Sequence, residues 1–223
     1  KFSVSSANLL KQLQIVSGAI GSNPVLPILE DFLFTIDGNT LKIAATDLET
    51  SISTEMEIQA SGSGEVAIPA KILLDTLKAL PEQPITFSVD EDNFAIGITS
   101  AYGKYKLAGE DGADFPTIPQ PDEVSSVEIP SSSLMNAIGK TLFATSNDDL
   151  RPAMTGVYFS VGNAELTCVA TDAHKLVKYT FQDVSSEVST TFILPKKALN
   201  LLKNALPAGE PVTVSFNKAN AFF

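Results

Sequence analysis

The chain contains the same pattern twice, about 125 residues apart. Residues 43–49 read Ile-Ala-Ala-Thr-Asp-Leu-Glu, and residues 168–174 read Cys-Val-Ala-Thr-Asp-Ala-His. Residues 68–81 (IPAKILLDTLKALP) return in a similar form as residues 194–207 (LPKKALNLLKNALP). Two motifs that recur in one order and at almost one offset indicate a duplicated unit of domain size, not the short unit of a solenoid. The 223 residues therefore predict two related domains, each with its own core.

The second copy is shorter than the first. After Pro81 the first copy continues through further strand-like stretches to an Asp-Phe-Pro turn, whereas the second copy reaches Phe223 without them. We therefore expect one domain over residues 1–121 and a second, truncated domain over residues 122–223, in a fragment of a longer protein. The proline-rich TIPQPDEVSS at 117–126 is the expected linker.

Four segments have the apolar spacing of amphipathic helices, and most other segments alternate as strands do. The helices are expected at about 6–20, 70–80, 131–145 and 195–206. Short strands are expected between them, separated by turn signals such as Asp37-Gly38-Asn39. Each unit is thus predicted as a helix, three or four strands, a second helix and further strands, which is an α+β fold.

Charge is divided unevenly between the predicted helices and strands. The helices carry seven lysines and one acid, a net charge of +6, so the rest of the chain carries −17 and the whole chain −11. Helices favour lysine and turns favour aspartate, which accounts for part of this division. The alternative is a protein with one face that attracts a polyanion and another that repels it. The helix residues concerned are Lys11, Lys71, Lys78, Lys140, Lys196, Lys197 and Lys203.

The type of basic residue indicates the type of contact. The chain has a single arginine, Arg151, and arginine is the usual reader of base edges. Lysines offer point charges to phosphates. The helix lysines therefore predict contacts with a nucleic-acid backbone that are independent of base sequence and sensitive to salt.

Motifs of several enzyme classes are absent from the sequence. It has no phosphate-binding loop, dinucleotide fingerprint, Cys/His metal cluster or GxSxG nucleophile motif, and we expect no cofactor and no metal. The lone Cys168 excludes a disulfide framework and is typical of a small buried hydrophobe. No apolar run approaches the roughly 18 residues of a membrane span. We expect a soluble, cytoplasmic protein with no membrane partner.

One pair of residues supports an enzymatic alternative. Asp172 and His174 would share a face if their segment were a strand, and such a pair serves in catalysis or holds a metal. No serine or cysteine nucleophile is recognisable beside them. The Thr-Asp step before them also occurs at Thr46-Asp47, where it fits a turn cap. A hydrolase with an Asp172/His174 centre is therefore the alternative to a binding protein.

Several motifs, taken in order, resemble the bacterial sliding clamp, the beta subunit of DNA polymerase III. They are LKQLQIVSGAI followed by LPIL at 26–29, ATDLE at 45–49, IPAK at 68–71, ADFP at 113–116, RPAMTGVYF at 151–159 and VATDAHKL at 169–176. The resemblance covers the whole chain. It implies a DNA-clamp fold, with two helices on one face of each domain and antiparallel β-sheets on the other. It also implies that this chain is domain one and most of domain two, with the third clamp domain absent.

The resemblance implies a function without catalysis. Two three-domain chains would close a ring around duplex DNA, with the helix lysines in the bore, and would keep the replicative polymerase on its template. The polymerase, the clamp loader and repair polymerases would dock through linear motifs.

The resemblance also names a docking site and a dimer contact. The domain-two wall of the docking pocket would be Arg151, Met154, Thr171, Ala173, His174, Lys175 and Leu176, where many members have glycine for Ala173 and arginine for Lys175. A homodimer would form in the full-length protein through an edge strand at 104–108, with Tyr105 and Leu107 on one side.

Overall fold

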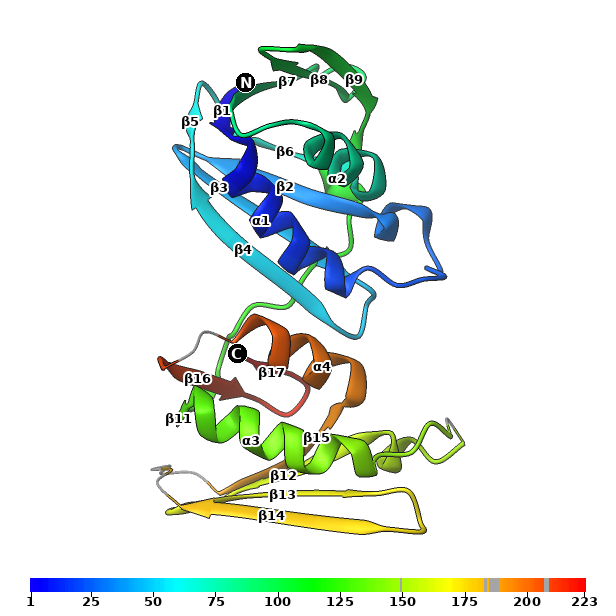
Figure 1. Ribbon diagram of the computed structural model, residues 1–223, viewed down its shortest axis with the longest axis vertical. Helices are drawn as coiled ribbons and strands as arrows, with labels where there is room; N and C mark the ends of the chain where they lie inside the picture. Colours follow the sequence, from blue (N-terminus) through cyan, green and yellow to red (C-terminus); the bar gives the residue numbers. More distant parts are fainter. Residues whose placement is uncertain (149, 183, 185–188, 207–208) are drawn as a thin grey trace. The chain divides into compact units, whose positions relative to one another are not determined.

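Two compact units make up the chain. The computed structural model describes residues 1–148, 150–182, 184, 189–206 and 209–223, and it divides into residues 1–118 and 119–223 (Figure 1). Each unit has its own hydrophobic core, and residues 117–124 form neither helix nor strand. Within the described residues, no helix is long and apolar enough to cross a membrane.

The first unit is built from two helices and two five-stranded antiparallel sheets. Its elements are β1 (Phe2–Ser5), α1 (Ser6–Val16), β2 (Asp31–Asp37), β3 (Thr40–Thr46), β4 (Ser51–Glu57), β5 (Gln59–Ala60), β6 (Gly64–Pro69), α2 (Ala70–Ala79), β7 (Pro84–Val89), β8 (Ala95–Ser100), β9 (Gly103–Ala108) and β10 (Glu110–Asp111). The strand orders are β5-β1-β7-β8-β9 and β10-β6-β2-β3-β4. Helices α1 and α2 lie side by side (Figure 1).

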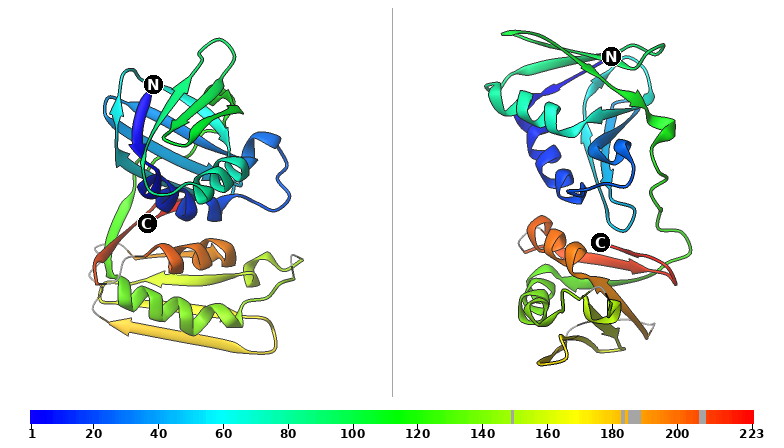
Figure 2. Two further views of the ribbon diagram at one scale, coloured as in Figure 1. Left: turned by 45° about the horizontal axis from the view of Figure 1, so that its top comes forward. Right: turned by 90° about the vertical axis from the view of Figure 1, so that its right-hand side faces the viewer.

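The second unit repeats this plan. Its elements are β11 (Ser125–Pro130), α3 (Ser131–Thr141), β12 (Gly156–Val161), β13 (Glu165–Thr171), β14 (Leu176–Gln182), β15 (Thr190–Pro195), α4 (Lys196–Ala205), β16 (Pro211–Phe216) and β17 (Ala221–Phe222). The strand order β14-β13-β12-β15 matches β4-β3-β2-β6, and β11-β16-β17 matches β1-β7-β8. In each unit the two helices lie on one side and the sheets on the other (Figure 2). This confirms the predicted α+β fold, with a duplicated domain.

The alternation of apolar residues places the cores. On β3, Leu41 and Ile43 are buried together with the aromatic residues of the neighbouring strands. Phe2 stacks on Phe87 with ring centroids 4.8 Å apart in the first unit. Phe159 stacks on Phe192 at 5.6 Å in the second. Burial of each such ring contributes about 2–3 kcal/mol, so both cores are stabilised by residues that also fix strand register.

Two of the predicted helices end earlier than expected. Helix α1 stops at Val16 and continues as a 3-10 turn over Ser17–Ala19, although the apolar spacing predicted helix to Ile20. The hydroxyl of Ser17 donates to the carbonyl of Gln14 at 2.9 Å, and such local bonding competes with the helical pattern. Helix α3 likewise stops at Thr141, whose hydroxyl donates to the carbonyl of Ala137 at 2.7 Å. In both cases apolar residues at helical spacing continue past the last helical residue, which is why the predicted helices were too long.

The prediction that each unit begins with a helix was wrong. Strands β1 and β11 come first, and Ser125 and Ser126, assigned to the linker, pair in β11 with Phe216 and Ser215. Each of these strands has only two inward apolar residues, such as Val127 and Ile129 in β11. An alternation that short is easily taken for a helix cap or a linker.

Asp31 is a carboxylate buried at the start of β2. The residue is 6% exposed, and burial, followed by the charges of Glu110 and Glu30, raises its pKa to about 6. A raised carboxyl pKa means that the folded state binds the proton more tightly than the unfolded state. The stabilisation by protonation is complete at low pH and is lost as the pH rises through 6.

We therefore expect Asp31→Asn to stabilise the first unit at neutral pH. Its free energy of unfolding at pH 7.5 should rise by about 1–2 kcal/mol, and the gain should shrink towards pH 4, where Asp31 is itself protonated. Urea unfolding of both proteins at the two pH values measures this. A gain of equal size at both would show that charge burial is not its cause.

Candidate nucleic-acid and peptide interfaces

Helices α1 and α2 bury their leucines and expose their lysines. Lys11 is exposed on α1, which packs through Leu9 and Leu13. Lys71 and Lys78 are exposed on α2. The 3.6-residue period of each helix separates the two sets, because the apolar stripe must face the core.

The helices of the second unit carry lysines of two kinds. Lys140 and Lys203 are exposed, whereas Lys196 and Lys197 are half-buried. The ammonium of Lys196 donates to the side-chain carbonyl of Asn147 at 2.9 Å. The structure therefore puts all seven predicted lysines on helices, but it does not leave them equally accessible.

The accessible helix lysines keep their charge uncompensated. In the part of the chain that the structure describes, the two ion pairs are Arg151–Asp148 and Lys175–Asp172, and neither involves a helix. Asp75 is the acidic residue of the four α-helices, and the other exposed acidic residues lie mostly on strands and in loops, as Glu55 does on β4. A polyanion near the protein is therefore attracted to the helices and repelled by the strands.

The predicted peptide wall contains a tight turn between β13 and β14. Asp172 accepts hydrogen bonds from the backbone N–H groups of His174 (3.0 Å) and Lys175 (2.9 Å), and the Lys175 ammonium binds its other oxygen. Thr171 donates to the Lys175 carbonyl at 2.8 Å and accepts from the N–H of Ala173 at 3.1 Å. The hydrogen bond from Lys175 is the main reason that the pKa of Asp172 lies well below its usual range.

The first unit builds the same turn with the matching Thr-Asp pair. Asp47 accepts from the N–H groups of Glu49 (3.1 Å) and Thr50 (2.7 Å), and Thr46 accepts from the N–H of Leu48 at 3.0 Å. The repeated Thr-Asp step is thus a turn cap, as one of the two alternatives predicted. The strand that would have put Asp172 and His174 on one face does not exist, and nothing in the site favours a hydrolase.

Ala173 occupies a backbone conformation that favours glycine. Its φ is +76°, and Leu48 at the matching place has φ +80°. A Cβ in this region costs about 1 kcal/mol or more. We expect Ala173→Gly to raise the free energy of unfolding of the second unit by about 0.5–1 kcal/mol, because relief of strain exceeds the added flexibility of glycine. Chemical denaturation measures the change.

Ala170→Gly is the matched control for that substitution. Ala170 is buried in β13, three residues away, where glycine only adds flexibility and removes packing. This variant should be less stable than the parent. Equal losses in both variants would contradict the strain at Ala173.

The two halves of the predicted wall lie at one end of a sheet. Arg151 and Met154 precede β12, and the turn with Leu176 follows β13. Since β12 and β13 are antiparallel, the start of one and the end of the other are neighbours. Leu176 is 67% exposed, Met154 is half-buried, and Arg151 pairs with Asp148 at 2.9 Å. Asp148 was not among the residues predicted for this site, although its spacing from Arg151 is typical of a local ion pair.

The predicted dimer strand is an edge. Among the described strands, β9 pairs with β8 alone. Lys104 and Lys106 are exposed on it, whereas Tyr105 and Leu107 are half-buried against the first core. The free backbone of β9, more than those two side chains, is thus available to another strand.

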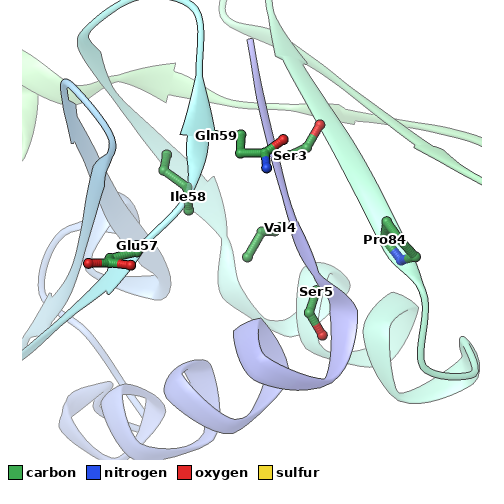
Figure 3. Close-up of a pocket in the computed structure, with 7 residues that line it drawn as sticks. All are labelled: Ser3, Val4, Ser5, Glu57, Ile58, Gln59 and Pro84. Carbon is green, nitrogen blue, oxygen red and sulfur yellow. The ribbon is translucent and has the colours of Figure 1, made fainter.

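A pocket of about 490 Å³ lies elsewhere in the first unit. It is lined by residues of β1, by the segment that crosses from β4 to β5, and by Pro84 (Figure 3). None of the predicted site residues lines it. Within the described residues, no three His, Cys, Asp or Glu side chains are grouped to hold a metal ion.

Comparisons with known proteins agree over both units. Residues 1–119 match the N-terminal domain of the DNA polymerase III beta subunit, and residues 128–223 match its central domain. The beta sliding clamp of Vibrio cholerae is 30% identical over 223 residues, which are 99% of this chain and 60% of that protein. The beta sliding clamp of Escherichia coli is 30% identical over 222 residues, with the same two shares.

Solved structures give the same result. The sliding clamp of Bacillus subtilis matches with a TM-score of 0.93 at 26% identity, over 97% of this chain and 60% of that one. The sliding clamp of Pseudomonas aeruginosa bound to griselimycin matches with a TM-score of 0.89 at 27% identity, over 97% and 59%. This chain thus spans about 60% of the length of these relatives. It belongs to the family of DNA polymerase III beta subunits, and it comprises that family's N-terminal and central domains.

Proposed function

We propose that the chain forms two of the domains of a sliding clamp, a ring that encloses duplex DNA and acts as a processivity factor without catalysis. The observation that carries this proposal is the set of exposed helix lysines that form no ion pair with any described residue, in a chain of net charge −11. The names of its relatives, beta sliding clamps, support it.

The lysines provide a grip that permits sliding. Each ammonium offers a mobile point charge to a phosphate and reads no base, so successive positions along the duplex are nearly equal in energy. Water between the ammonium groups and the phosphates would keep these contacts loose. The acidic strands oppose DNA binding at other faces.

The wall around the β13–β14 turn would receive linear motifs from the replicative polymerase, the clamp loader and repair polymerases. Leu176 and Met154 offer apolar surface, and Arg151, Thr171 and His174 offer polar groups around it, as in most peptide pockets. The Pseudomonas aeruginosa clamp bound to griselimycin is consistent with a ligand pocket in this family. The free edge of β9 would close a homodimer.

Topological retention on DNA tests the ring. The intact gene product, loaded by its clamp loader on a nicked circular plasmid, should remain with the plasmid during gel filtration at high salt. Cutting the plasmid once with a restriction enzyme should release it, because a ring slides off an end. Equal retention on circular and linear DNA would contradict the proposal.

A further inference from the structure

Lys196 differs from the exposed helix lysines in its surroundings. Its side chain is half-buried, and its ammonium donates to the Asn147 carbonyl oxygen at 2.9 Å. Lys203, two turns further along α4, is exposed. A lysine that already holds a side-chain acceptor must give up that bond before it can meet a phosphate.

The backbone of Lys196 also contacts the segment before β12, of which the structure describes residues 146–148 and 150–155. Its N–H donates to the Thr155 carbonyl at 3.2 Å, and the N–H of Ser146 donates to the Met154 carbonyl at 2.8 Å. The start of α4 thus contacts the segment near its beginning through a side chain and near its end through the backbone.

Residues of the predicted peptide wall lie on this segment. The carbonyl of Met154 accepts the hydrogen bond from the N–H of Ser146 that joins the two ends of this segment. Asp148, next to Asn147 in the chain, accepts from the Arg151 guanidinium at 2.9 Å and from the N–H of Leu150 at 3.1 Å. Asn147 is therefore one residue from the carboxylate that orients Arg151.

The first unit lacks the corresponding lysine. The motif IPAK at 68–71 aligns with LPKK at 194–197, so buried Ala70 stands where the second unit has Lys196. Lys71 and Lys197 share the next position. Lys196 is thus present only in the unit that carries the predicted peptide wall.

We propose that Lys196 is a positioning residue for the peptide site and not a phosphate contact. Its ammonium fixes Asn147, and the neighbouring Asp148–Arg151 pair and the Ser146–Met154 hydrogen bond carry that position to Arg151 and Met154. A segment held in its binding geometry loses less entropy when a peptide binds, which increases affinity without a direct contact. The inference rests on the proposed peptide-docking function.

Hydrogen exchange on the 223-residue chain tests the anchor without DNA or peptide. Lys196→Met should speed exchange of the Ser146 amide about 3- to 10-fold, the factor that corresponds to one net hydrogen bond. Lys196→Arg, which keeps a donor, should restore protection, and Lys203→Met should not change it. Unchanged exchange in Lys196→Met would overturn the proposal, whatever the protein binds.

Binding assays on the intact gene product separate the two roles. Lys196→Met should weaken a clamp-binding peptide about 3- to 10-fold in calorimetry and leave the salt dependence of DNA binding unchanged. Lys203→Met should do the reverse, with a loss of about one from the salt slope. A lowered slope with normal peptide affinity in Lys196→Met would make it a phosphate contact. If the parent protein binds neither ligand, the proposed function itself fails.

Discussion

Replacement of Lys71, Lys78 and Lys203 by glutamate in the intact protein is expected to abolish most of its affinity for duplex DNA. Each of the three is exposed on a helix and has no ion pair among the described residues. Each lost phosphate contact should lower the slope of log K against log salt by about one, so the triple variant should lose about three. Fluorescence anisotropy with a duplex between about 50 and 200 mM salt measures it.

A triple variant outside the helices is the matched control. Lys1, Lys178 and Lys218 are exposed, lie outside the helices and outside the predicted dimer strand, and their replacement by glutamate changes the net charge by the same amount. This control should retain nearly the parental slope, since long-range repulsion is screened beyond about 10 Å at moderate salt. Equal losses in the two triple variants would mean that net charge, and not a helical face, determines DNA affinity.

The helical lysines could be placed from sequence because their position follows from a local rule. The apolar stripe Leu73 and Leu77 must face the core, so Lys71 and Lys78 must face away from it. The placement of these lysines requires no knowledge of the rest of the fold. The duplicated domain plan is predicted from sequence as well, because the apolar stripes recur at nearly the same offset as the Thr-Asp steps.

The contacts of Lys196 could not be placed in this way. Asn147 lies 49 residues away in the chain, and the two meet only because β12 and β15 pair in one sheet. By contrast, the ion pair of Asp148 and Arg151 could have been predicted from sequence, because opposite charges three residues apart often pair. Long-range partners of polar side chains depend on strand register, which periodicity alone does not fix.

At Asp172 the sequence did not distinguish a strand from a turn. Alternation extends β13 to Thr171, and nothing apolar marks its end, so Asp172 and His174 fitted a strand as well as a turn. The structure distinguishes a turn from a strand here because two backbone N–H groups converge on the Asp172 carboxylate. The positions of these N–H groups cannot be inferred from the sequence. The repeat of the step at Thr46-Asp47 was the available signal, because an architectural turn recurs in both copies of a domain.

Leu176→Asp in the intact protein is expected to abolish binding of a clamp-binding peptide. Leu176 is 67% exposed beside the β13–β14 turn, where an apolar side chain gains by being covered. A carboxylate there would be desolvated by the peptide, and losses at central apolar contacts often exceed about 2 kcal/mol, or roughly 30-fold in affinity. Met154→Asp should act in the same direction, and calorimetry measures both.

The first unit supplies the control for this substitution. Leu48 is 54% exposed on the matching turn, where its φ of +80° is one that aspartate tolerates. Leu48→Asp should leave peptide affinity at the parental value, and both variants should unfold at the parental denaturant concentration. Normal affinity in Leu176→Asp would place the peptide elsewhere on the protein. A loss in Leu48→Asp as well would show that the turns of both units bind partners, and that the duplication copied a docking site together with the fold.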